Sequence, residues 1–202
     1  MPDIAMPFSR TPEPFDHADW IFEIKFDGLR ATALLENRKV RLVSHTGSVY
    51  SQFAELCAAL PGAIRARQAT IDGEVVCLDD RGRPVFDDLV SRRGRPVFVA
   101  FDLLALDGTD LRPLPVLERK QRLQRIMPED SGCILFLGHV DGRGIELYRF
   151  ACENDLEGII AKRKRGRYSP VPRTSWVEIR NPRYSQALGR PEWRQPEERR
   201  PA

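Results

Sequence analysis

Hydrophobic and polar residues alternate along several short segments of the chain, which is the pattern of half-buried β-strands. Between Trp20 and Lys25, the apolar Phe22 and Ile24 share one face, while Glu23 and Lys25 share the other. Similar alternating or strongly apolar runs predict further strands over residues 31–35, 40–44, 70–78, 96–105, 133–140, 158–164 and 176–180.

Other segments repeat their apolar residues every three or four positions, which predicts amphipathic helices. We expect helices over residues 52–67, 86–92, 115–127 and 144–154. In the first, the Pro61-Gly62 step should kink or end the helix. The residues expected to face inward are Phe53, Leu56, Leu60 and Ile64 in the first helix, and Leu117, Leu123 and Ile126 in the third. Strands joined mainly by hairpin-type connections, with helices between them, predict an α+β fold built on antiparallel sheets.

The composition is that of one folded domain of ordinary size. The 202 residues are 42% hydrophobic and 30% charged, which allows a substantial core. No apolar run approaches the ~20 residues of a membrane span, and the first ten residues lack the pattern of an export signal. We therefore expect a cytoplasmic protein without a membrane partner. The four cysteines form no CxxC pair or His/Cys cluster, so core thiols are expected rather than zinc ligands.

Charge and proline content divide the chain into three parts. The prolines of residues 1–19 predict an extended lead-in, followed by one domain over residues 20–182. Residues 183–202, rich in Pro, Arg and Glu, are expected to form a poorly ordered basic tail. Residues 158–202 hold 12 Lys/Arg against 4 Asp/Glu, whereas the rest of the chain holds 20 against 25. A basic end fits nucleic-acid binding and fits a solubilising tail equally well.

The segment E-I-K-F-D-G-L-R, residues 23–30, places a lysine where nucleotide-transfer chemistry needs a nucleophile. A turn at Asp27-Gly28 follows Lys25 and brings Arg30 back near it. A lysine attacks phosphorus only when unprotonated, and we expect burial and a nearby cation, such as Arg30 or a bound metal, to lower its pKa. Taken alone, these residues also fit a surface strand with a solvated lysine.

Further residues with useful chemistry lie on or beside predicted strands. Glu74 can bond a ribose hydroxyl or a metal, and Phe101 offers a face on which a base can stack. Glu157 begins a strand and can hold magnesium, while Lys162 near its end can meet a phosphate. Each signal is weak by itself, because a solvated strand glutamate or a core phenylalanine would look the same.

In their order and spacing, these residues resemble the nucleotidyltransferase superfamily of ATP-dependent DNA ligases and mRNA capping enzymes. The signature K-x-D-G-x-R is present as Lys25, Asp27, Gly28 and Arg30, followed by D-G-E, F-D-L-L-x-L-D-G, E-G-I-x-A-K and W-x-x-I-R. Over residues 20–182 the chain is similar to the adenylation domain of bacterial end-joining ligases, and to short bacterial ligase-like proteins without an oligonucleotide-binding (OB) domain. The resemblance implies a nucleotidyltransferase (ATP-grasp-like) fold of two antiparallel sheets flanked by helices.

The resemblance also implies an activity, that of an ATP-dependent DNA ligase in DNA repair. Lys25 would take AMP from ATP with Mg²⁺ or Mn²⁺ and pass it to the 5′-phosphate of a nick, where the 3′-hydroxyl displaces it. The resemblance assigns nucleotide binding to Glu23 at the adenine edge, Lys25, Arg30, Glu74, Phe101 stacked on adenine, Glu157, Lys162 at the α-phosphate and Arg180. It assigns metal binding to Glu74 and Glu157, and contact with nicked DNA to Asp27, Arg30 and His45.

The chain departs from the family pattern at three positions where the family carries positive charge. The family usually has two lysines on the last strand, where this chain has Glu178 and Arg180. Two like charges ~5 Å apart repel by roughly 3 kcal/mol at an effective dielectric of about 20, so a carboxylate facing the nucleotide would slow phosphoryl transfer. Period-two alternation puts Glu178 and Arg180 on one face, where we expect them to pair. His45 stands where the family usually has an arginine.

No OB domain follows the adenylation domain, so we expect the grip on DNA to come from the domain itself, from the basic tail or from another end-joining or repair protein. The leading interpretation is a minimal DNA ligase. One alternative is a weakened module that binds nucleotide or DNA ends and supports another repair enzyme, and another is an RNA ligase or capping-type enzyme. The motif around Lys25, with Glu74 and Glu157, favours the ligase, whereas Glu178 favours the binding module.

Overall fold

The computed structural model describes residues 6–128, 131–169, 175–188 and 190. The strands are β1 (Ser9–Arg10), β2 (Asp16–Lys25), β3 (Leu29–Glu36), β4 (Lys39–Ser44), β5 (Gln68–Cys77), β6 (Pro96–Leu106), β7 (Thr109–Asp110), β8 (Ile134–Phe136), β9 (Val140–Arg143), β10 (Gly158–Arg163) and β11 (Trp176–Arg180). The α-helices are α1 (Ala54–Ala63), α2 (Phe86–Val90), α3 (Val116–Ile126) and α4 (Gly144–Glu153), and short 3₁₀ turns occupy Ser51–Phe53 and Ser185–Ala187.

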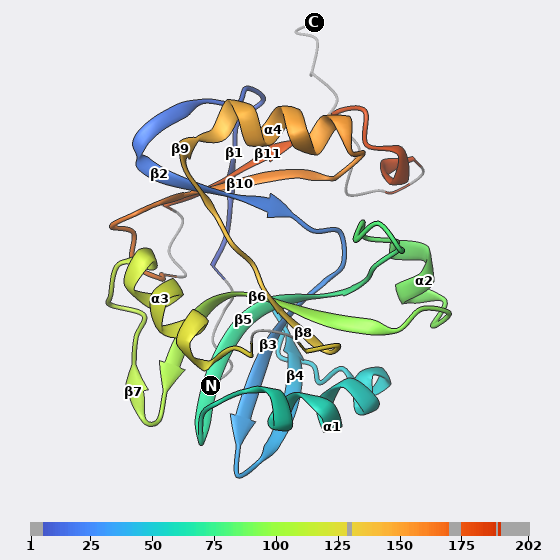
Figure 1. The fold of residues 1–202 in the computed structure, drawn as a ribbon, viewed down its shortest axis with the longest axis vertical. Helices are drawn as coiled ribbons and strands as arrows, with labels where there is room; N and C mark the ends of the chain where they lie inside the picture. Colours follow the sequence, from blue (N-terminus) through green and yellow to red (C-terminus); the bar gives the residue numbers. More distant parts are fainter. Residues whose placement is uncertain (1–5, 129–130, 170–174, 189, 191–202) are drawn as a thin grey trace, which may run out of the picture.

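The strands form two mostly antiparallel sheets that lie one above the other (Figure 1). The upper sheet has the strand order β1-β11-β10-β2-β9. The lower sheet has the order β4-β3-β5-β6-β7, with β8 added beside β6. The expected α+β architecture of two antiparallel sheets flanked by helices is therefore confirmed.

Each sheet buries an apolar face against helices. Helix α4 covers the upper sheet on the side away from the lower sheet, where Phe22, Ile159 and Ile179 pack with Ala151 of the helix (Figure 1). Helices α1 and α3 pack against the lower sheet in one large core. The expected inward face of α1 is confirmed, because all four of its predicted residues are buried. Pro61 lies inside this helix, which ends at Ala63.

A third apolar cluster lies between the two sheets. It contains Phe101 of the lower sheet and Ile160 and Trp176 of the upper sheet, together with Met6 and Tyr168. The alternation predicted for β2 is confirmed, since Phe22 and Ile24 pack towards α4 while Glu23 and Lys25 face a cavity. The acidic and basic side chains of β2 therefore point into the space between the sheets.

The prediction of one strand over residues 133–140 is wrong. Ile134–Phe136 form β8, which runs parallel to β6 in the lower sheet, whereas Val140–Arg143 form β9, which pairs with β2 in the upper sheet. The chain thus crosses from one sheet to the other within a few residues. The sequence pattern does not mark such a crossing, because each half is a short edge segment of which only Ile134 is fully buried.

The predicted inward face of helix α3 is confirmed for Leu123 and Ile126 and wrong for Leu117, which is only half-buried. Arg119 and Lys120 are fully buried instead. Arg119 makes a bidentate ion pair with Asp102, at 2.7 Å for each nitrogen, and Lys120 Nζ lies 2.5 Å from Glu23 Oε1. A buried cation requires a buried partner, and these two carboxylates come from β6 and β2.

Both ends of the described chain pack on the body. Within the expected lead-in, β1 pairs in parallel with β11, which sets Arg10 opposite Glu178. Within the expected tail, Tyr184 and Arg190 bond Asp27, and the Gln186 side chain bonds the backbone at residues 84 and 86. Residues 191–202 lie outside the described part.

Two expectations from composition can be compared with the structure. Cys77 and Cys133 are buried, as expected for core thiols, whereas Cys57 and Cys152 are half-buried, and all four are free. Across the described residues, none of the helices has the length and apolar character needed to cross a membrane.

Gly158 provides a test of how β10 fits between its neighbours. Its φ is +145°, and a Cβ there would lie 2.2 Å from the carbonyl oxygen of Ile179. We expect Gly158→Ala to lower the free energy of unfolding by about 2 kcal/mol or more, measured by urea denaturation. The control is Gly62→Ala in α1, where an added Cβ meets nothing within 4 Å, and which should be neutral or stabilising by up to about 1 kcal/mol. Equal stability of Gly158→Ala and the parent would contradict this account.

Candidate active site

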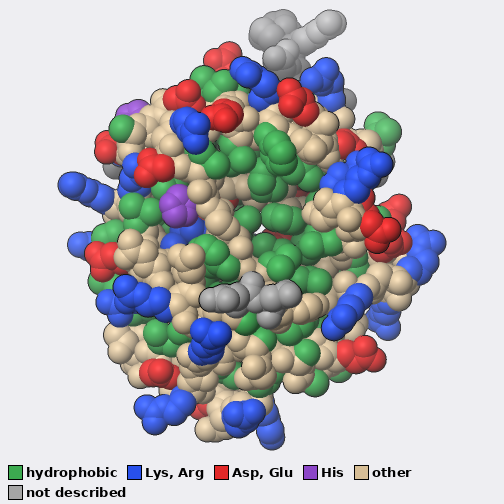
Figure 2. All heavy atoms as spheres, viewed as in Figure 1, with side chains coloured by type: hydrophobic (Ala, Val, Ile, Leu, Met, Phe, Trp, Pro, Cys, Tyr) green, Lys and Arg blue, Asp and Glu red, His purple; other side chains and the backbone are tan. Residues whose placement is uncertain are grey.

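A cavity of about 120 Å³ lies between the sheets and is lined by side chains from both. Figure 2 shows hydrophobic side chains around a hollow at the centre of one face of the molecule. Six of the residues predicted to bind nucleotide line this cavity: Glu23, Lys25, Arg30, Glu74, Phe101 and Lys162. Phe8 and Trp176 add two further aromatic walls. The cavity thus combines apolar surfaces with a few convergent charged groups, as ligand sites do.

Strand pairing places Lys25 among carboxylates. Lys25 is the last residue of β2 and pairs with Gly158 of β10, so that Glu157 lies directly beside it. Lys25 Nζ donates a hydrogen bond of 2.7 Å to Glu157 Oε2. Glu178 Oε1 lies 3.8 Å from the same nitrogen. The ammonium group is therefore held at the edge of the cavity by two acidic side chains.

These carboxylates decide the protonation state of Lys25. Burial lowers the pKa of Lys25, but the negative charges of Glu157, Glu74 and Glu178 outweigh burial, and the net pKa lies above its usual value. The expectation that burial and Arg30 together lower this pKa is therefore wrong for the protein without ligands. Arg30 is engaged elsewhere, in a bidentate ion pair with Asp72. Lys25 is an ammonium ion in this state.

Glu74 and Glu157 supply the donor chemistry of a divalent-metal site. Burial raises the pKa of Glu74 to about 8, and the charge of Glu157 adds to the rise, although Lys25 and Arg30 oppose it. Burial also raises the pKa of Glu157. Two neighbouring carboxylates with raised pKa values suit a divalent cation, whose charge would stabilise their ionised forms. Mg²⁺ or Mn²⁺ commonly binds one or two carboxylates together with substrate phosphates. Among the described residues there is no group of three acidic, His or Cys side chains that could hold a metal without such phosphates.

Glu178 is surrounded by three cations. Its carboxylate is 3% exposed and lies 2.6 Å from Arg10 Nε, 3.1 Å from Arg180 Nε and 3.8 Å from Lys25 Nζ. Burial raises the pKa of Glu178, but Lys25, Arg10 and Arg180 together lower it below its usual value, so the group is ionised. The expected pairing of Glu178 with Arg180 is confirmed. Neither Arg180 nor Glu178 lines the cavity itself, and Glu178 lies beside it through its contact with Lys25.

The other end of the cavity holds a buried ionic and aromatic cluster. Glu23 lies between two lysines, with Lys162 Nζ 2.6 Å from Oε2 and Lys120 Nζ 2.5 Å from Oε1. The Lys162 ammonium also lies 3.9 Å from the Trp176 ring centroid and 4.6 Å from that of Phe101. Burial lowers the pKa of Lys162. Lys162 thus lies beside the residue predicted to contact adenine, and its contact with the α-phosphate stays a prediction.

Arg30 is fixed in the cavity wall by a network that spans the sheets. Besides Asp72, it donates to the carbonyl oxygen of Met6 at 2.8 Å and lies 5.0 Å from the Phe8 ring centroid. Tyr168 completes the network by donating to Asp72 Oδ2 at 2.8 Å and accepting from the Met6 amide at 3.0 Å. The segment before β2 therefore forms part of the site.

The residues predicted to contact nicked DNA occupy different environments. Asp27 is 5% exposed, and its carboxylate accepts hydrogen bonds from Tyr184 at 2.7 Å and from both terminal nitrogens of Arg190 at 2.7 and 2.8 Å. Asp27 thus anchors the segment after β11 to the turn that follows Lys25. His45 is exposed just beyond β4. The roles of both residues at a nick stay predictions.

Sequence reasoning missed several residues of the site. Phe8, Arg10 and Lys120 take part through contacts with residues far away in the chain, which no local pattern reveals. Trp176 belonged to the W-x-x-I-R motif, and an aromatic residue opening a strand that ends in charged residues was a usable signal. Its ring contacts those of Phe8, Phe101 and Tyr168 at centroid distances of 5.8 to 5.9 Å.

Comparison with known proteins gives consistent matches over nearly the whole chain. The family pattern described as "ATP dependent DNA ligase domain" matches residues 2–180. The multifunctional non-homologous end joining protein LigD of Pseudomonas aeruginosa is 31% identical over 188 residues, which cover 89% of this chain and 22% of LigD. The prophage-derived DNA ligase-like protein LigB of Bacillus subtilis is 28% identical over 185 residues, or 87% of this chain and 66% of LigB.

The fold is also found in a solved structure. The structure of mycobacterial DNA ligase D complexed with ATP and MES superposes with a TM-score of 0.72 at 28% sequence identity, covering 89% of this chain and 61% of that chain. The chain therefore spans 22% of LigD from Pseudomonas aeruginosa, 21% of LigD from Mycobacterium bovis and 61% of the solved ligase chain.

The raised pKa of Glu74 has a consequence for stability. The pKa is about 8 in the folded protein and 4.5 in a solvated glutamate, so the folded state holds more protons between these values. The free energy of unfolding should therefore fall as the pH rises from 4.5 to 8, by at most about 1.4 kcal/mol per pH unit. We expect Glu74→Gln to remove this contribution, which urea denaturation at pH 5 and pH 8 without metal would show.

The control is Glu36→Gln, because Glu36 is exposed at the end of β3. Its pH dependence should follow that of the parent. If the curve of Glu74→Gln runs parallel to that of the parent, Glu74 does not hold its proton as described.

Proposed function

The chain belongs to the family of ATP-dependent DNA ligase domains, a class of nucleotidyltransferases, and on this premise we propose that it forms a lysine–AMP intermediate on Lys25 and seals nicks in DNA. ATP is the substrate of this family, which generally works with a divalent metal. The observation that carries the proposal is the position of Lys25 at the edge of a cavity, with Glu157 at 2.7 Å and Glu74 in the same wall.

The cavity supplies separate groups for the base and for the sugar. Phe101 and Trp176 offer aromatic faces for adenine, and Glu23 offers a carboxylate oxygen to its exocyclic amine. Arg30 and Glu74 line the same cavity from the lower sheet and would hold the ribose. A nucleotide bound in this way brings its α-phosphate to the Lys25 side of the cavity.

The chemical step begins with the loss of a proton from Lys25. The ammonium group already donates to Glu157 Oε2, and its proton can leave by this oxygen to the solvent as a cation takes its place on the carboxylate. The neutral amine then attacks the α-phosphorus. A nitrogen–phosphorus bond forms, the bond from that phosphorus to the bridging oxygen of pyrophosphate breaks, and the second proton on the nitrogen leaves with the pyrophosphate. A divalent cation held by Glu74 and Glu157 would neutralise phosphate charge and reduce the hold of these carboxylates on the Lys25 proton.

The second half of the reaction uses nicked DNA. AMP passes from Lys25 to the 5′-phosphate, and attack by the 3′-hydroxyl releases AMP and joins the strands. The excess of basic residues after position 158 supports a salt-sensitive contact with the DNA backbone that depends little on sequence. Cooperation with another end-joining or repair protein is part of the same proposal.

Glu178 favours a second candidate function. A carboxylate 3.8 Å from the nucleophile opposes the build-up of phosphate charge, which suits a module that binds nucleotide or DNA ends without efficient catalysis. An RNA ligase or capping-type activity would use the same lysine chemistry, and comparison of nicked DNA with nicked RNA separates it from DNA ligation.

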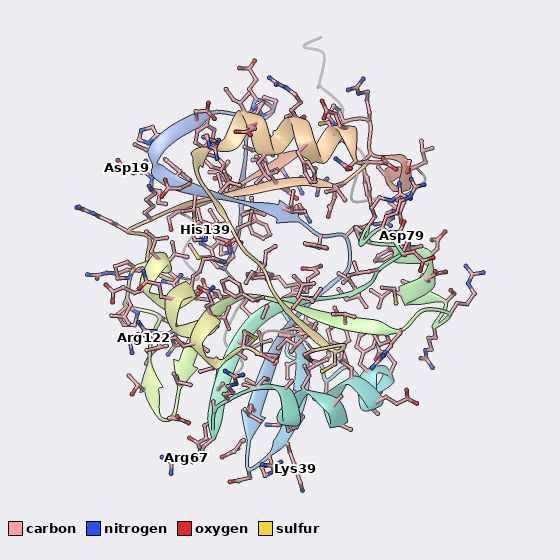
Figure 3. All side chains as sticks on the ribbon, viewed as in Figure 1. Asp19, Lys39, Arg67, Asp79, Arg122 and His139 are labelled. Carbon is pink, nitrogen blue, oxygen red and sulfur yellow. The ribbon has the colours of Figure 1, made fainter. Side chains whose placement is uncertain are left out.

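The test is covalent labelling with ATP that is radioactive at the α-phosphate, in the presence of Mg²⁺ or Mn²⁺. We expect acid-labile labelled protein from the parent, and at least ~1,000-fold less from Lys25→Ala, because the other lysine that lines the cavity, Lys162, is held by Glu23. Lys39→Ala is the matched control, since Lys39 lies at the far end of the molecule, away from the space between the sheets (Figure 3). A parent that binds ATP but takes no label with either metal would favour the binding module.

A further inference from the structure

The pairing of β1 with β11 brings an exposed arginine to a buried carboxylate at the site. Arg10 lies opposite Glu178 in the strand register, and its Nε donates to Glu178 Oε2 at 2.6 Å. The Arg10 side chain is 62% exposed, whereas that of Glu178 is 3% exposed. A guanidinium carries five N–H donors in a planar fork, so a contact through Nε leaves the group able to bind an anion from the solvent side.

The strand register places Arg10 in one row with the adenine end of the cavity. Glu23 of β2 pairs with Ile160 of β10, Ile160 pairs with Glu178 of β11, and Glu178 pairs with Arg10 of β1. Neighbouring strands lie about 4.8 Å apart, so Arg10 is roughly 14 Å from Glu23 across the upper sheet. Lys25 Nζ reaches from β2 to within 3.8 Å of Glu178 on β11. A nucleotide with its base at Glu23 and its α-phosphate at this nitrogen therefore directs its β- and γ-phosphates towards β11 and β1.

The buried negative charge of Glu178 requires cations beside it. One oxygen faces Lys25 and Arg180 and the other faces Arg10. Without Arg10, a triphosphate approaching Lys25 would meet a carboxylate that is compensated from one side alone. With Arg10, the rim of the site presents a guanidinium to the phosphates, where the family usually has a lysine in place of Glu178.

We propose, building on the proposed adenylation of Lys25, that Arg10 is a substrate-binding residue which contacts the β- and γ-phosphates of ATP and the pyrophosphate that leaves, with Glu178 as the group that positions it. A guanidinium matches the geometry of phosphate oxygens and binds them through charge-assisted hydrogen bonds. Arg10 therefore acts in the steps that involve pyrophosphate and has no part in the later transfer of AMP to DNA.

The test compares two half-reactions in Arg10→Ala, Arg10→Lys and the parent, all as full chains. We expect Arg10→Ala to raise the KM for ATP in adenylation at least ~10-fold and to weaken, to a similar degree, the discharge of the lysine–AMP form by added pyrophosphate. Joining of nicked DNA by protein already carrying AMP should stay within about twofold of the parent. Arg10→Lys should retain most of the ATP affinity.

A double substitution tests the role of Glu178. In Arg10→Ala/Glu178→Gln, the uncompensated carboxylate is gone, so the KM for ATP should recover partly from its value in Arg10→Ala. Arg149→Ala is the matched control, because Arg149 is exposed on α4, on the outer side of the upper sheet. It should leave both half-reactions unchanged.

Three results would overturn the inference. They are an unchanged KM for ATP in Arg10→Ala, an equal loss in the pyrophosphate-independent joining step, and a change in melting temperature alone.

Equilibrium binding of ATP separates this inference from the proposed function. If the parent binds ATP without forming an adenylate, the proposed function fails. In that case, ~10-fold weaker ATP binding by Arg10→Ala still supports the inference, and equal binding overturns it.

Discussion

The ammonium group of Lys25, held between Glu157 and Glu178 at the mouth of a cavity, is the interaction on which the rest of the site depends. It requires β10 to lie between β2 and β11, so that Gly158 pairs with Lys25 on one side and Arg180 on the other. Gly158 allows this close approach because it has no side chain to meet the Ile179 carbonyl. The two sheets then close over the lysine from opposite sides, which gives it both its carboxylate neighbours and its aromatic surroundings.

The inner face of the upper sheet buries charges that are balanced by segments from across the molecule. Glu23 is matched by Lys120 of α3 and Lys162 of β10, and Glu178 is matched by Lys25 and by Arg10 of β1. A buried charge is costly unless it is paired, and in this network each carboxylate is engaged by two or more cations. A bound triphosphate and metal must exchange partners with it. The raised pKa of Lys25 is therefore a property of the resting state, and catalysis requires ligand binding to reverse it.

The strands, helices and motif residues of this chain could be read from its sequence because their signals are local. Alternation along β2 separated Phe22 from Glu23 and Lys25, and the order of the motifs brought six of the candidate residues to one cavity. The predictions that failed concern contacts between residues far apart in the sequence. Burial of Lys120 depends on Glu23, almost a hundred residues earlier, and the crossing from β8 to β9 depends on which sheet accepts each half.

Glu178, the residue of opposite charge on the last strand, shows that contacts in the site also join residues far apart in the sequence. From the sequence, a glutamate in this position predicted repulsion and pairing with Arg180, and the pairing is confirmed. Arg10, which also compensates the charge of Glu178, lies 168 residues away from it in the sequence. The two residues meet through the parallel pairing of β11 with β1, a strand of only two residues. Such a short strand carries no pattern of its own, because a period of two needs more than two residues to be recognised.

The most direct test of this account is a titration of the Lys25 side-chain nitrogen by NMR, with ¹⁵N-labelled lysine assigned through Lys25→Arg. Without nucleotide, we expect Lys25 to stay protonated to a higher pH than a solvated lysine, whose pKa is 10.5. With Mg²⁺ and a non-reactive ATP analogue, the pKa of Lys25 should fall. A Lys25 pKa already below the ordinary value of a solvated lysine in the free protein would contradict the account.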